Sequence, residues 1–159
     1  MDEHDRAHDD PRQDDLGDLL QEIRVLIQGA QVLTAFLVIL PFSAGFDDLS
    51  QAERWVYVAT FALSVLSLVL FSAPAAQHRL TRPLVQRERF KDMATRFMIA
   101  GLVAVSIALV LATQLVVSQV VGVPWSLFWA SVVGVGVLIF WWVFPLHQRH
   151  ALSRPDPEP

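Results

Sequence analysis

The sequence contains no cysteine, and this absence removes several kinds of chemistry at once. Disulfide bonds, thiolate metal sites and cysteine nucleophiles are all excluded. Lysine is nearly absent as well, since eleven of the twelve basic residues are arginine. The sequence also lacks a phosphate-binding loop, an HExxH motif and a nucleophile with a base nearby. We therefore expect no enzymatic activity, no metal site and no cofactor.

Charged residues are missing from four long stretches, which cover residues 25–42, 55–76, 97–121 and 125–144. Overall 53% of the residues are hydrophobic, above the roughly 45–50% that is usual for soluble proteins. Each stretch has at least 18 residues, enough for a helix to cross about 30 Å of hydrocarbon. We predict an all-α integral membrane protein, a four-helix bundle made of two antiparallel transmembrane hairpins.

Both ends of the chain differ from this membrane domain, which we place at residues 16–146. Residues 1–15 are acidic and polar, too poor in apolar groups to offset chain entropy, so we predict a disordered tail and no cleavable signal peptide. From Leu16 apolar residues recur every three or four positions, which predicts an amphipathic helix that continues into the first span. Residues 147–159 are predicted to be a second disordered tail.

Local signals mark where helices begin and end. Ser50 and Glu53 have the spacing of a capping box and predict a helix start. Pro74 is expected to bend or end the last turn of the second span. Gly122 and Pro124 predict a tight turn, with glycine just past one helix and proline at the start of the next.

The basic residues of the loops predict the orientation, because loops retained in the cytoplasm carry an excess of Lys and Arg. Arg54 is the one basic residue between the first and second spans, and the turn between the third and fourth has none. The other eleven lie before the first span, in the central segment between the second and third spans, or after the fourth. We therefore expect both termini on the cytoplasmic side of the membrane.

A line of polar groups follows the first span. At 100° per residue, five positions fall within an arc of about 80°. We call this line the polar stripe: Gln21, Arg24, Gln28, Gln31 and Ala35. It should face protein or water rather than lipid. Two interpretations stay open, either hydrogen bonding between helices or the lining of a path for a ligand or ion.

The same residues share a depth with the end of the second span. We expect a polar cluster at the cytoplasmic mouth, in which Glu22 can pair with a nearby base. Its members are Glu22, Arg24, Gln28, Gln31, Gln77, His78 and Arg79.

The central segment 77–96 carries six basic and two acidic residues and should stay at the membrane surface. Basic residues near an anionic leaflet contribute about 1 kcal/mol each to binding. We expect contacts to anionic lipid headgroups from Arg82, Arg87, Arg89, Lys91 and Arg96. No nucleic-acid partner is expected.

Small residues predict where helices meet. In the third span, small residues repeat every four positions at Ala100, Ala104, Ala108 and Ala112. The second span follows the same interval, interrupted by Leu68, at Thr60, Ser64, Ser72 and Ala76. Small side chains let helix backbones approach closely in lipid. Ordinary packing within the chain is the expected use of these faces.

The segments LLQEIRVLIQGAQVLTAFLVILPF and APAAQHRL carry a family resemblance. Over about residues 16–121 the chain resembles a family of small bacterial membrane proteins known as domain of unknown function 6328. The matching residues are Glu22, Arg24, Gly29, Gln31, Phe36, Pro41, Phe42, Pro74, His78 and Arg79. The resemblance implies a membrane location and an uncharacterised role.

Two functions are compatible with these observations. The first is a non-catalytic assembly or regulatory subunit with another membrane protein or a further copy of itself as partner. The second is a small oligomeric transporter or channel lined by the polar stripe. Ion-coupled transport usually needs an ionisable group at mid-membrane, and the four spans as drawn contain none.

Overall fold

Six helical elements follow one another along the chain. The computed structural model describes residues 11–80, 87–144 and 147, with side chains described for 21–77, 93–144 and 147. The elements are α1 (Pro11–Ile39), η1 (Leu40–Phe42), α2 (Gln51–Leu80), α3 (Arg87–Val121), α4 (Val123–Val137) and η2 (Leu138–Val143). The described ranges contain no strand, which confirms the all-α prediction.

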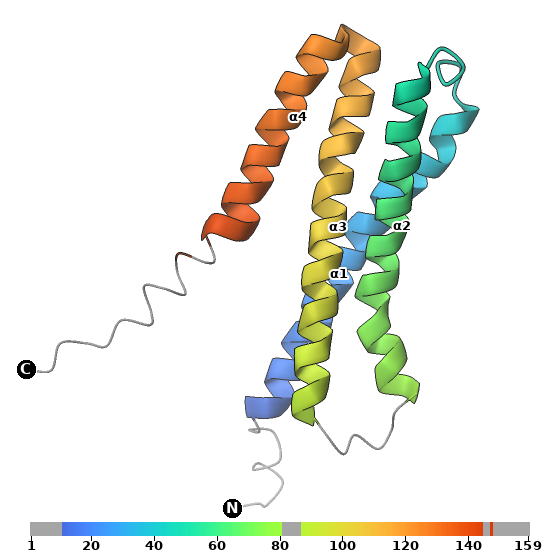
Figure 1. The fold of residues 1–159 in the computed structure, drawn as a ribbon. Coiled ribbons are helices and arrows are strands. Elements are labelled where there is room, and N and C mark those ends of the chain that lie inside the picture. Colours follow the sequence, from blue (N-terminus) through green and yellow to red (C-terminus); the bar gives the residue numbers. More distant parts are fainter. Residues whose placement is uncertain (1–10, 81–86, 145–146, 148–159) are drawn as a thin grey trace, which may run out of the picture.

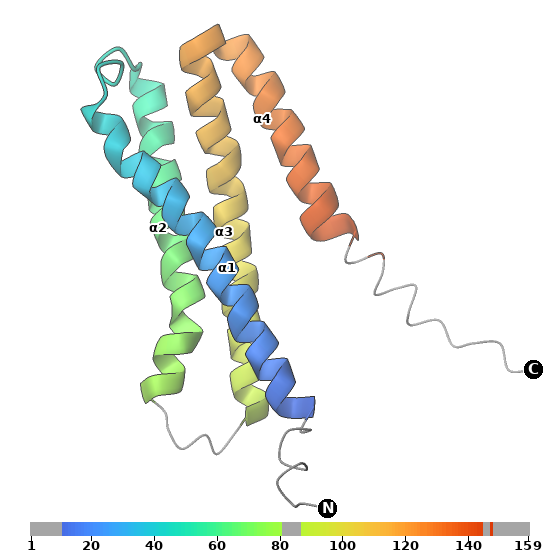
Figure 2. The ribbon, with the colours of Figure 1, turned by 180° about the vertical axis from the view of Figure 1, so that it is seen from behind.

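The helices run up and down between two ends of the molecule (Figure 1). At one end, called here the N-terminal end, α1 and α3 begin and α2 finishes. The other end, called here the loop end, holds the connection 43–50 between α1 and α2 and the turn between α3 and α4 (Figure 2). The alternating directions follow from short connections, which require neighbouring helices to be antiparallel.

Four segments are long and apolar enough to cross a membrane, as predicted. They are Gln21–Phe42, Gln51–Gln77, Met93–Val121 and Val123–Val143. Three of them begin about one helical turn before the charge-free stretches, because each includes a charged residue near its start. A lipid-facing surface accounts for the large exposed side chains on all four, such as Phe36, which is 70% exposed.

One predicted boundary was wrong, and one of the two alternatives predicted at Pro74 is excluded. Helix α1 begins at Pro11, so residues 11–15 are helical and not part of a disordered tail. Proline suits the first turn of a helix, where its fixed φ is helical and its missing N–H is not needed. Helix α2 does not end at Pro74 but continues to Leu80. The ring of Pro74 is fully buried, so packing holds the helix together where propensity would break it.

The turn signals, in contrast, were confirmed. Ser50 and Glu53 form the reciprocal capping box: the Ser50 N–H donates to Glu53 Oε2 at 2.9 Å, and the Glu53 N–H donates to Ser50 Oγ at 3.3 Å. Gly122 has φ of 87°, a left-handed conformation that glycine adopts without strain. Pro124 stands in the first turn of α4, as expected.

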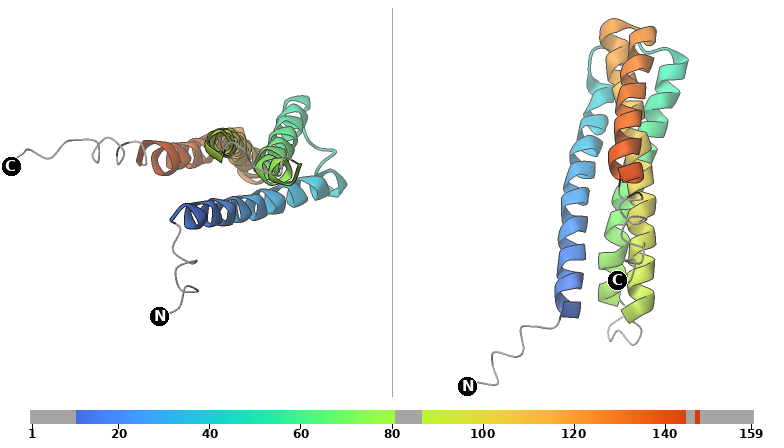
Figure 3. Two further views of the ribbon diagram at one scale, coloured as in Figure 1. Left: turned by 90° about the horizontal axis from the view of Figure 1, so that it is seen from below. Right: turned by 90° about the vertical axis from the view of Figure 1, so that its left-hand side faces the viewer.

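The core is built by three helices, with α4 laid against one of them. The buried cluster takes Ile23 and Ala30 from α1, Phe71 from α2, and Met98 and Val105 from α3. The most extensive contacts join consecutive helices, α2 with α3 above all. Helix α4 packs on α3, on the side away from α2 (Figures 1 and 3). The four antiparallel helices of the prediction are present, with α4 at the side of a three-helix core.

The fourth span changes its winding near its end. After Val137 the chain continues as a π-helix, in which the Phe144 N–H donates to the Ile139 carbonyl. A π-helix is wider than an α-helix and rarely extends beyond a short segment. The predicted single α-helix over 125–144 thus holds only as far as Val137.

Candidate functional site

The polar stripe lies on the outside of the chain. All five of its residues are exposed, and so is Glu22 beside it. The opposite face of α1 carries Ile23, Ala30 and Leu37, which are buried. Across the side chains that the structure describes, Gln28 and Gln31 take part in no hydrogen bond or ion pair. The stripe therefore points away from the three-helix core.

The predicted polar cluster is only partly within the described residues. Gln77 is half-buried near the end of α2, while the four members on α1 are exposed. The side chains of His78 and Arg79 lie outside the described residues. The pairing of Glu22 with a base of this cluster stays a prediction.

The candidate lipid-binding residues are similarly placed. Arg96 is exposed on α3. Arg82 lies outside the described residues, as do the side chains of Arg87, Arg89 and Lys91, whose backbone belongs to the start of α3. The four of these residues that belong to α3 lie near its start, at the N-terminal end of the molecule. Their contact with lipid headgroups stays a prediction.

Hydroxyl groups of the second span face the core, where they are satisfied locally. Thr60, Ser64 and Ser67 are fully buried. Thr60 donates to the Val56 carbonyl at 2.7 Å, and Ser67 donates to the Ser64 carbonyl at 2.7 Å. Such bonds to the preceding turn let hydroxyl groups lie in an apolar surrounding without an orphan donor. We assign this row to packing.

One hydroxyl contact joins two helices. The Oγ atoms of Thr34 on α1 and Ser64 on α2 are within hydrogen-bond distance, and Ser64 is the donor, because the single hydroxyl hydrogen of Thr34 goes to a backbone carbonyl. Thr34 donates to the Ala30 carbonyl at 2.8 Å. Thr34 belongs to the inward face of α1, so this contact fixes how α1 is rotated on the core and leaves the polar stripe outside.

A second polar site lies at the loop end, and sequence reasoning had found only half of it. Besides the capping box, Oε1 of Glu53 accepts a hydrogen bond from Ser118 Oγ at 2.9 Å and one from Gln119 Nε2 at 2.9 Å. Ser118 and Gln119 belong to the end of α3. We call these four residues the loop-end latch: Ser50, Glu53, Ser118 and Gln119.

The latch could have been anticipated from depth alone. Glu53 begins the second span and Ser118 ends the third, so both lie at the loop end although 65 residues separate them. What the sequence does not contain is the rotation of each helix, which decides whether the groups meet. That rotation comes from the packing of α2 on α3.

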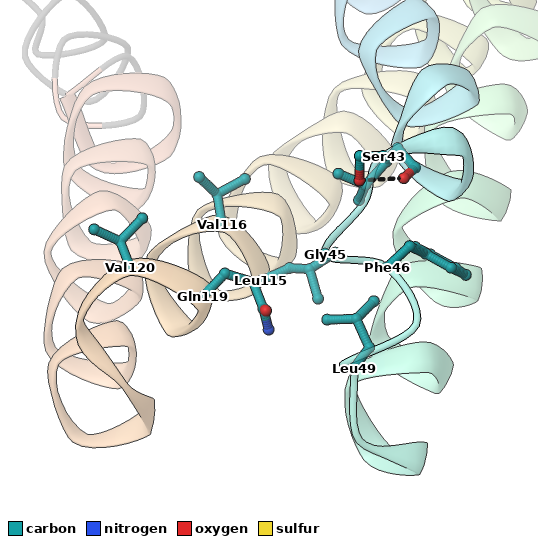
Figure 4. A pocket seen from close by; sticks show the side chains of 9 residues that line it. Ser43, Gly45, Phe46, Leu49, Leu115, Val116, Gln119 and Val120 are labelled. Atoms are coloured by element: carbon teal, nitrogen blue, oxygen red, sulfur yellow. Dashed lines mark hydrogen bonds between the residues drawn. The ribbon is translucent and has the colours of Figure 1, made fainter.

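An apolar cavity adjoins the latch. Its volume is about 240 Å³, and Figure 4 shows side chains from the end of α3 and from the connection 43–50 around it. Gln119 is a lining residue shared with the latch. Ser43 donates to the Leu40 carbonyl at 2.7 Å and so closes η1 beside the cavity. Arg54 donates to the carbonyls of Leu49 and Asp47, which holds the connection against α2.

A larger groove of about 420 Å³ lies between α3 and the fourth span. Its walls are apolar apart from Ser106, whose hydroxyl donates to the Leu102 carbonyl at 2.6 Å. In a bilayer this groove is open to the hydrocarbon. Among the described residues, no group of three or more His, Cys, Asp or Glu could hold a metal ion.

The fold and these sites define the class: a multi-pass α-helical membrane protein with four spans. Within that class the chain belongs to the family of unknown function designated DUF6328, whose family model matches residues 7–145. The match confirms the resemblance noted in the sequence and extends it over the fourth span. No curated protein and no solved structure matches the chain.

Proposed function

We propose that this protein is a non-catalytic assembly or regulatory subunit of the bacterial cytoplasmic membrane, with both termini in the cytoplasm. Its role is to bind protein through the outer surface of α1. The distribution of basic residues supports the orientation, because Arg54 alone lies in the connections at the loop end.

The observation that carries the proposal is the exposure of Gln28 and Gln31 within a span. Counted from Val25 or from Gln21, Gln31 lies about 10–15 Å inside the hydrocarbon at 1.5 Å per residue. An amide in hydrocarbon without a hydrogen-bond partner costs several kcal/mol. Since no side chain among the described residues satisfies either amide, a protein partner is the natural source of their hydrogen bonds.

The same observation favours one competing function. Several copies that turn their stripes toward a common axis would line a polar path, as in a small oligomeric transporter or channel. Such a path needs water at the stripe, whereas a subunit interface excludes it. The two functions therefore differ in a measurable way.

Flux into liposomes tests the choice. We expect liposomes with the purified wild type to be no more permeable to K⁺, Cl⁻ or protons than liposomes with the double variant Gln28→Leu, Gln31→Leu. A flux that the wild type supports and the Leu variant loses would replace the assembly function by transport. A photocrosslinking residue at position 28 tests assembly itself, because it should capture protein in intact membranes while the same residue at position 36 captures mainly lipid.

A further inference from the structure

The outward face of α1 has a regular spacing. Gln21, Gln28 and Ala35 recur every seven residues, and Arg24, Gln31 and Val38 follow each of them by three. All six are exposed. Positions that alternate by three and four residues over two heptads form the a and d seam of a left-handed helix pair. This seam is separate from the one that α1 buries, which runs through Ile23, Ala30 and Leu37.

The side chains of the seam suit a close helix neighbour. Ala35 is small and exposed, so it leaves room for a neighbouring helix at the end of the seam. Small residues let two membrane helices approach until their backbones and short side chains touch. Gln28 and Gln31 then bring amides into the middle of the contact, and a polar residue at an a position fixes the register of paired helices.

Membrane insertion restricts which partner fits. All copies of the chain have the same orientation in the bilayer, so two copies related by a two-fold axis along the membrane normal place equal residues at equal depth. A glutamine therefore meets the same glutamine. An amide is both donor and acceptor, which makes it one of the few side chains that can pair with its own copy.

We propose that α1 is the interface of a parallel homodimer, in which Gln28 and Gln31 hydrogen-bond to Gln28 and Gln31 of the partner subunit. This inference rests on the proposed function, since it requires protein at the stripe, and it names that protein as a second copy of the chain. Arg24 would be brought near its own copy. It lies at the N-terminal end, where guanidinium groups reach headgroups and water and where Glu22 is close in sequence.

The absence of cysteine makes this interface directly testable. Ala35 and Phe36 are neighbours, both are exposed, and they differ by 100° in direction on α1. A disulfide forms only where two Cβ atoms come within about 4.5 Å. In intact membranes treated with a membrane-permeant oxidant, we expect Ala35→Cys to give a dimer in at least about fivefold higher yield than Phe36→Cys. Equal yields would overturn the homodimer.

A second pair of variants tests the amides. Adding Gln28→Leu and Gln31→Leu to Ala35→Cys should lower the dimer yield severalfold, whereas adding Phe36→Leu should leave it unchanged. Leucine is favoured over glutamine in a lipid-facing helix, so insertion is not impaired. An unchanged yield in the Leu pair would show that the amides do not hold the interface.

The purified wild type separates the two proposals. A dimer in nanodiscs that the Leu pair converts to a monomer supports both. If the wild type is monomeric but a photocrosslinking residue at position 28 captures another membrane protein, the assembly function stands and the homodimer falls. A monomer that captures only lipid at position 28 overturns both.

Discussion

At the scale of single residues, Gly101 on α3 packs tightly against Phe71 on α2. Phe71 is 0% exposed, and a Cβ built on Gly101 would lie 2.5 Å from its ring. A phenylalanine ring enclosed on all sides has no free rotamer into which it can withdraw. The glycine is therefore a steric requirement of the α2 and α3 contact.

The substitution Gly101→Ala should therefore destabilise the protein in spite of the better helix propensity of alanine. Overpacking a tight core costs about 1–3 kcal/mol, while replacing a helical glycine by alanine gains about 1 kcal/mol. We expect a lower midpoint of thermal unfolding in a fixed detergent.

Gly136 provides the matched control, because nothing lies within 4 Å of a Cβ placed there. Gly136→Ala should leave the midpoint unchanged or raise it. Adding Phe71→Leu to Gly101→Ala should restore part of the loss by making room. If Gly101→Ala is as stable as Gly136→Ala, the ring of Phe71 does leave room for a Cβ at position 101.

The small-residue pattern in the sequence located this interface but not its rotation. Ala104 and Ala108 are buried as the four-residue repeat predicted, whereas Ala100 is exposed and Gly101 takes its place. A strict interval of four drifts around a helix with 3.6 residues per turn. The buried line therefore shifts by one residue over two turns.

At the scale of helices, the loop-end latch ties the first turn of α2 to the last turn of α3. Glu53 lies where the helix dipole of α2 favours a negative charge, and its two oxygens serve different partners. Oε2 accepts from Ser50 on its own helix, and Oε1 accepts from Ser118 and Gln119 on the other. One carboxylate thus caps a helix and joins two spans.

A double-mutant cycle on Glu53 and Ser118 separates these two contributions. Glu53→Ala should cost about 1–3 kcal/mol, since it removes the carboxylate half of the capping box and the hydrogen bonds that this charged group accepts from Ser118 and Gln119. Ser118→Ala should cost less. Because the two side chains interact directly, the combined loss should fall short of the sum by about 0.5–1 kcal/mol.

The cycle between Glu53 and Ser43 is the control, because Ser43 donates to the Leu40 carbonyl and not to the carboxylate. Its two losses should add. If the losses in free energy of unfolding also add for Glu53 and Ser118, the latch does not join the two spans.

Helix existence could be predicted from the sequence because apolar length, capping residues and turn residues are local properties. The capping box at Ser50 and the glycine turn at Gly122 were correct for this reason. Contacts between helices were harder, since they depend on rotation. The polar stripe illustrates the limit: its residues were identified, but only the burial of Ile23 and Leu37 shows that it faces away from the core.

At the scale of the whole molecule, the chain is a three-helix core with a fourth span held through α3. Its predicted orientation rests on the charges of the loops. Reporter fusions at positions 48 and 123 should be active outside the cytoplasm, and fusions at position 85 and at the C-terminus inside it. The reason is that eleven of the twelve basic residues lie in the segments that share one side, and this side is expected to be the cytoplasm. A C-terminus accessible from outside the cell would contradict the charge argument.

The acidic N-terminal residues and the basic central segment are both joined to helices at the N-terminal end of the molecule. Helix α1 begins at the end where α2 finishes and α3 begins (Figure 1). Residues 1–24 carry nine acidic and three basic residues, against two acidic and six basic in segment 77–96. Charges within a Debye length of about 10 Å at 0.1 M salt attract one another, so the tail should compete with anionic lipid for this segment.

Neutralising the tail should therefore strengthen binding to anionic lipid. Replacing the acidic residues of segment 1–10 by Asn or Gln changes none of the residues of α1, Pro11–Ile39. With each basic residue worth up to about 1 kcal/mol at an anionic surface, release of even one should raise the affinity for anionic vesicles about fivefold. The gain should appear at low salt and shrink at high salt, because both competing attractions are screened.

The variant Asp47→Asn, Asp48→Asn is the control, because these residues lie at the loop end and their replacement should leave the affinity unchanged. If the tail variant also binds anionic vesicles no better than the wild type at low salt, the acidic residues do not compete for the basic segment.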